Sequence, residues 1–155
     1  MPTGQLSPEK RIVEARKFLD LTMGQIRDAM AAENGSFKHA LRLPGMRGQL
    51  RVVVKCRNSS PTCWSMSVIL YSSRFDGRVD CIDWEHLFVT MDGQSGSGFH
   101  RHIWHSEVMS CEKYKLALPE FRPTSVEEFI LQGLALFGVV LQEEESNDDA
   151  QMRLR

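Results

Sequence analysis

The residues of this chain with the clearest potential for chemistry are three histidines in the segment 98–105, which has the sequence GFHRHIWH. In an extended strand, side chains alternate between the two faces. His100 and His102 would therefore lie on one face together with Trp104, and Arg101 would lie on the other. Two adjacent imidazoles can bind a metal ion, divide the roles of acid and base, or form structural hydrogen bonds. The segment alone does not distinguish these three roles.

An acid–base role would suit the cleavage of a phosphodiester. Without a metal ion, this reaction needs a base, an acid for the leaving oxygen, and cations that neutralise the phosphate. His100 and His102 would be the acid and the base, and His86 and Arg101 complete the set of candidate catalytic residues. The leading hypothesis is a metal-independent ribonuclease with RNA as its partner, and it includes no cofactor. Whether the chain is an enzyme at all stays open.

Two alternatives use the same histidines differently. A zinc site needs three or four converging ligands, so His100 and His102 would need a third ligand from His86, His105 or Asp92. The protein would then be a metal-dependent hydrolase. In the other alternative, the histidines are structural and the chain is a non-enzymatic module that binds another protein.

A predicted hairpin before the histidines gathers positive charge on one face. Segments 36–43 and 50–57 alternate with period two, and a Pro-Gly turn joins them. The outward-facing basic residues are Lys38, Arg42, Arg51, Lys55 and Arg57. Like charges on neighbouring strands repel unless an anion neutralises them, so this face is the candidate site for nucleic acid. A solvated surface is the alternative interpretation.

Local patterns predict the elements that must hold these residues. Pro8 begins a helix expected over 8–20, and Thr22 caps a second helix that ends at Asn34-Gly35. Further strands are expected over 63–71 and 78–84, at the histidine segment, and at 114–118. Thr124 and Glu127 form an expected capping box for the last helix. The order predicts an α+β fold: an N-terminal helix or helix pair, an antiparallel meander of about five strands, and a C-terminal helix packed on the sheet.

Length and composition predict one domain. A chain of 155 residues with 42% hydrophobic residues suits a single α+β domain over 1–141. The segment 142–155 is an acidic tail that we expect to be disordered. Its five acidic and two basic side chains leave the remainder at a formal charge of +2, within a total of −1. No signal-like segment or apolar run of about 18–20 residues occurs, so we expect a cytoplasmic protein with no membrane partner.

The run from Arg78 to Leu141 resembles small uncharacterised prokaryotic proteins, some of them toxins of toxin–antitoxin pairs. The residues that carry the resemblance are Arg78, Asp80, His86, Asp92, Gly93, Gly98, His100, His102 and Trp104. The resemblance implies a protein of mobile elements or defence systems, with nuclease activity as one option and an antitoxin-like protein as a partner. It does not indicate the oligomeric state.

Overall fold

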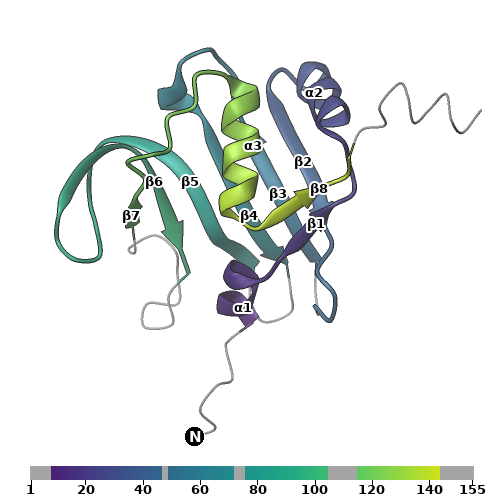
Figure 1. Ribbon diagram of the computed structural model, residues 1–155, viewed down its shortest axis with the longest axis horizontal. Coiled ribbons are helices and arrows are strands. Elements are labelled where there is room, and N and C mark those ends of the chain that lie inside the picture. Colours follow the sequence, from purple (N-terminus) through teal and green to yellow (C-terminus); the bar gives the residue numbers. More distant parts are fainter. Residues whose placement is uncertain (1–7, 47–48, 72–75, 105–114, 144–155) are drawn as a thin grey trace, which may run out of the picture.

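Figure 1 shows an antiparallel sheet with one helix, α3, lying across one of its faces. This computed structural model describes residues 8–46, 49–71, 76–104 and 115–143. The strands of the sheet follow one another in the order of the sequence, and each is antiparallel to the next. They are β2 (Ser36–Leu41), β3 (Gln49–Lys55), β4 (Ser65–Tyr71), β5 (Asp76–Val89), β6 (Ser95–Ile103) and β7 (Lys115–Ala117). The predicted α+β class and meander are confirmed, with six strands described where about five were expected.

The remaining elements lie before and after this sheet. They are α1 (Pro8–Glu14), α2 (Met23–Ala32), a short 3-10 helix η1 (Pro61–Cys63) and α3 (Val126–Leu136). Two short strands, β1 (Lys17–Leu19) and β8 (Val139–Leu141), form a separate parallel pair. None of the helices in the described ranges is both long and apolar enough to span a membrane.

The helix predicted over 8–20 is wrong in its second half, because the chain leaves the helix after Glu14 and becomes β1. Extended backbone turns Lys17 and Leu19 to the same side, and both side chains are buried. The amide of Lys17 donates to the carbonyl of Gly138 across 2.9 Å. This pairing connects residues more than a hundred positions apart, so the local helical pattern could not reveal it.

The other predicted helix boundaries are correct to within about two residues. Thr22 caps α2 in a capping box with Gln25, and Asn34 and Gly35 follow with φ values of 54° and 86°. Ser125, one residue after the expected Thr124, is the N-cap of α3 because its side chain accepts from the Glu128 amide. Residues 144–155 of the expected tail lie outside the described residues.

The hydrophobic core lies between the sheet and its covering elements. On the covered face, Val54 pairs with Met66, and Met66 pairs with Ile82. Buried residues from all three α-helices belong to the same core cluster as these strand residues, namely Ile12, Ile26, Met30, Phe129, Ile130 and Leu134. In the described part of the chain, the helices therefore cover one face of the sheet, and the opposite face remains available for other roles.

Three charged residues are embedded at the covered face near the end of α3. Arg101 makes two hydrogen bonds to Asp80, at 2.8 and 2.6 Å, and its guanidinium lies over the ring of Phe137. Lys17 Nζ donates to the carbonyl oxygens of Ala15 and Phe137, at 3.0 and 2.5 Å. Asp80 and Lys17 are both fully buried. Burial raises the pKa of Asp80 although Arg101 opposes this shift.

Lys17 should give the protein a characteristic pH dependence. Burial lowers the pKa of Lys17 to about 8, because desolvation exceeds the attraction of Asp80. Between that pH and the ordinary lysine pKa of 10.5, the unfolded chain keeps the proton and the folded chain loses it, so the free energy of unfolding increases with pH by up to about 1.4 kcal/mol per unit. Urea unfolding at about pH 7.5 and about pH 9.5 should show this increase in the wild type and its loss in Lys17→Met. An equal pH response of both proteins would contradict the assignment.

Two glycines provide a matched test of packing against backbone conformation. Gly35 and Gly93 have φ values of 86° and 84°, but a Cβ at Gly35 would clash with the backbone carbonyl oxygen of Cys56, whereas Gly93 has nothing within 4 Å. Gly93→Ala should cost about 1–2 kcal/mol for the left-handed conformation alone. Gly35→Ala should cost about 3 kcal/mol or more because the clash is added. Chemical denaturation measures both, and similar losses would show that the approach to Cys56 is unimportant.

Candidate metal centre

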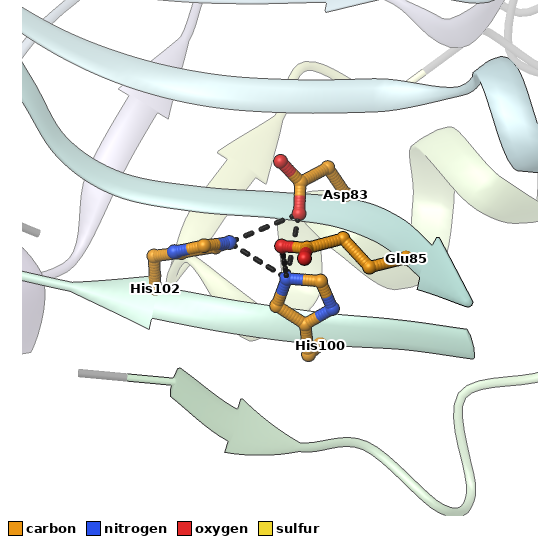
Figure 2. A group of neighbouring side chains, drawn as sticks. All are labelled: Asp83, Glu85, His100 and His102. Atoms are coloured by element: carbon orange, nitrogen blue, oxygen red, sulfur yellow. Dashed lines mark hydrogen bonds and ion pairs between the residues drawn. The ribbon is translucent and has the colours of Figure 1, made fainter. Parts of the chain in front are cut away.

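Four side chains from the β5–β6 hairpin converge on the face of the sheet that the helices leave uncovered. Asp83 and Glu85 come from β5, and His100 and His102 come from β6 (Figure 2). Asp83 lies directly opposite His100 in the antiparallel register, and Cys81 lies opposite His102. Side chains two residues apart on a strand share a face, so the pairing places all four on the same side. The sequence prediction that His100 and His102 stand side by side is confirmed.

The potential ligand atoms lie close together. His100 Nε2 is 2.8 Å from Asp83 Oδ1, 3.1 Å from Glu85 Oε1 and 2.7 Å from His102 Nε2. His102 Nε2 is 3.0 Å from Asp83 Oδ1. Neighbouring ligands of an ion with bonds of about 2.1 Å are separated by about 3.0–3.4 Å. All four ligand atoms lie within 4.8 Å of one another, and the short separations among them would have to widen by a few tenths of an ångström to accommodate an ion.

With both carboxylates ionised, protons on the imidazoles alone cannot satisfy these contacts. His100 Nδ1 lies 3.2 Å from the carbonyl oxygen of Gly98, which can only accept, so this nitrogen carries a proton. At 2.7 Å, only one of the two Nε2 atoms can carry a proton. If His102 Nε2 carries the proton, His100 Nε2 is an acceptor and faces two carboxylates. If His100 Nε2 carries the proton, His102 Nε2 is an acceptor and faces Asp83. In either case acceptors oppose acceptors, and a bound cation would remove this conflict.

A curled part of the β5–β6 hairpin closes around the histidines. A register shift between Glu85 and Phe88 interrupts the pairing, and the Phe88 ring lies 4.4 Å from the His100 ring, centroid to centroid. Gly96 permits this approach, because a Cβ there would lie 2.5 Å from the Phe88 ring. The amide of Met91 donates to the carbonyl of Lys115 on β7, at 3.3 Å. His100 is fully buried as a result.

Charge around the centre favours ionised carboxylates. Burial opposes ionisation of Asp83, but the neighbouring imidazoles of His100 and His102 outweigh it and hold the pKa of Asp83 well below its usual range. A hydrogen bond of 2.8 Å from Lys115 lowers the pKa of Glu85. Two carboxylates and two imidazoles are thus available as ligands, and Lys115 lies beside them.

The other predicted catalytic residues do not join this centre. Arg101 points to the covered face and pairs with Asp80, as strand alternation requires. His86 is exposed, and its ring makes an edge contact with Trp84 at 4.5 Å. Asp92 is exposed in the turn after β5 and bonds to Thr90. His105 lies outside the described residues.

Three of the five predicted nucleic-acid-binding residues share the uncovered face with the centre. Lys38 on β2, and Arg51 and Lys55 on β3, alternate with residues of the core. Arg42 pairs with Asp20 at 3.2 Å and stacks on Phe18, so its charge is already compensated. Arg57 is exposed just beyond the end of β3.

Sequence reasoning missed Asp83 and Glu85, although they supply half of the cluster. The strand was expected to end at Trp84, whereas β5 continues to Val89. The available signal was the alternation of Cys81, Asp83 and Glu85 on one face, followed by a turn and a second strand with alternating histidines. Antiparallel pairing across that turn brings the two polar rows together. His86 and Asp92 were predicted as third ligands only because they lie near the two histidines in the sequence.

Comparison of the chain with protein-family models, with curated proteins and with solved structures finds no match. The resemblance to toxins of toxin–antitoxin pairs, and the antitoxin-like partner that it implies, therefore stay predictions. The case for a function depends on the geometry of the hairpin.

Proposed function

We propose that the protein binds one divalent transition-metal ion through Asp83, Glu85, His100 and His102. The observation that carries the proposal is the convergence of four possible ligand atoms within 4.8 Å of one another, whose contacts imidazole protons alone do not satisfy while both carboxylates are ionised. The hydrogen bond from His100 Nδ1 to Gly98 supports it, because a metal-bound histidine commonly donates its other nitrogen to a carbonyl. Two carboxylates balance the charge of a dication.

The ligand set also indicates what kind of chemistry such an ion could perform. Two imidazoles and two carboxylates suit first-row ions such as Zn²⁺, Mn²⁺ and Fe²⁺. A tetrahedral zinc ion would have no open position, which is typical of structural sites. An ion with six ligands would retain two positions for water or substrate, as metal-dependent hydrolysis requires. The side chains of Asp83 and Glu85 are 31% and 39% exposed, so solvent reaches this side of the centre, and we therefore favour a six-coordinate ion and a hydrolytic role over a purely structural one.

The metal-independent alternative uses His100 and His102 as acid and base. It requires that the imidazoles direct their reactive nitrogens toward a substrate. Here both Nε2 atoms point toward each other and toward the carboxylates, and His100 is fully buried. The geometry therefore favours the metal over the acid–base pair, and a chelator separates the two in the experiment below.

Metal binding should be visible in both composition and stability. Elemental analysis of the purified protein, or of apoprotein reloaded with Mn²⁺ or Zn²⁺, should give about one ion per chain. An ion at a hundred times its dissociation constant should raise the free energy of unfolding by about 2.7 kcal/mol, because only the folded chain presents the site. Asp83→Asn and His102→Gln should lose the ion and this stabilisation.

His86→Gln provides the control, since His86 lies on the same strand but away from the centre. It should bind metal as the wild type does. If millimolar Mn²⁺, Zn²⁺ and Fe²⁺ all leave the melting temperature of apoprotein unchanged, the proposal is wrong. Chelator-insensitive cleavage of RNA that disappears in His100→Ala would instead favour the acid–base pair.

A further inference from the structure

The uncovered face of the sheet carries more than the metal centre, and the strand register relates its parts. Ser67 on β4 lies between Val53 on β3 and Cys81 on β5, and Cys81 lies opposite His102. Lys55 and Ser65 form the neighbouring pair on the same face, two residues further along. The proposed ligands and the cations of β3 therefore belong to one continuous surface.

Spacing places Lys55 within reach of an anion held at the centre. Strands in a sheet are about 4.8 Å apart, so the backbones of β3 and β5 are about 10 Å apart. The strand between them contributes the short side chains of Ser65 and Ser67, which are half-buried. Lys55 is exposed and can extend across this shallow part of the surface toward Asp83. A phosphate could thus contact the metal on one side and the ammonium group on the other.

The cations extend further than one phosphate requires. Arg51 and Lys55 are four residues apart on β3, which corresponds to about 13 Å along the strand. Arg51 and Lys38 both lie over the ring of Tyr71, at 5.8 and 5.7 Å from its centroid, so a base that stacks on this ring would replace one of these cation contacts. Within the described residues, Lys38, Arg51 and Lys55 have no carboxylate partner. Cations without a carboxylate partner, two of them over a half-buried aromatic ring, are a combination that binds single-stranded nucleic acid.

We infer that a single-stranded nucleic acid, represented in the experiment by RNA, lies across this face, with phosphates on Arg51 and Lys55, a base against Tyr71 and one phosphate at the metal centre. The inference rests on the proposed metal site and adds the class of its ligand. Phosphate contacts would supply most of the affinity, so binding should weaken as salt increases. Stacking on Tyr71 would distinguish nucleic acid from other polyanions.

The experiment measures fluorescence anisotropy of a labelled RNA of about ten nucleotides on metal-loaded protein at low salt. Arg51→Gln combined with Lys55→Gln should weaken binding at least tenfold and reduce the salt slope by about 1.4, since each phosphate contact in a single strand contributes about 0.7. Arg122→Gln is the control, because it removes an exposed cation between β7 and α3. It should leave the affinity unchanged within about twofold.

Two further binding measurements test the contact of the nucleobase with Tyr71 and the contact of the phosphate with the metal ion. Tyr71→Ala should weaken RNA binding about tenfold but leave the binding of inorganic polyphosphate unchanged. Saturating Mn²⁺ should strengthen RNA binding at least about fivefold, and RNA should strengthen Mn²⁺ binding by the same factor. His102→Gln should abolish this coupling without removing the salt-dependent contacts of β3.

The outcomes separate this inference from the metal proposal. If one ion per chain is bound but the Arg51/Lys55 double variant binds RNA as tightly as wild type, the RNA inference is overturned and the metal site stands. Equal losses for RNA and polyphosphate in Tyr71→Ala would also overturn it. If no ion binds, the metal proposal fails, and the metal-coupling arm of this inference fails with it.

Discussion

The register between β5 and β6 is the constraint on which both faces of the molecule depend. Side chains alternate along each strand, so a slip by one residue would exchange the two faces. Asp80 is fully buried and bonded to Arg101 on the covered face, while Asp83 and His100 meet on the other. A slip would leave a buried carboxylate without its partner, at a cost of about 3–5 kcal/mol. The ion pair with Arg101 therefore helps to hold the metal ligands in place, although Arg101 does not contact them.

The irregularity in β5 is as important for the centre as its regular part. Beyond Glu85 the register shifts, and this brings Phe88 onto His100. Bulges of this kind bend a strand and redirect its side chains, and they are common beside functional sites. Lys115 makes two hydrogen bonds with this hairpin. Its carbonyl oxygen accepts from the amide of Met91, and its ammonium group donates to Glu85. The enclosure lowers the local polarity and so strengthens the attraction between the carboxylates and a cation.

The sequence predicted the features that depend on local pattern. Alternation correctly placed Leu50, Val52 and Val54 in the core, and it placed the two histidines side by side. It could not predict β1 and β8, because three-residue parallel strands form only when distant segments meet. Asp83 and Glu85 were missed for a related reason. Their role depends on which residues of β6 face them, and that pairing is decided by the whole hairpin, not by the residues near each carboxylate.

The charges of the centre suggest how metal and phosphate binding depend on each other. Without an ion, Asp83 and Glu85 outnumber Lys115, so the centre has one net negative charge and repels phosphate. A bound dication changes this to one net positive charge, in a partly enclosed position where electrostatic attraction is little weakened by water. Arg51 and Lys55 are exposed or half-buried, so salt screens their attraction more strongly. The exposed cations would therefore attract a nucleic acid at long range, whereas the metal would hold one phosphate at short range, and only in the loaded protein.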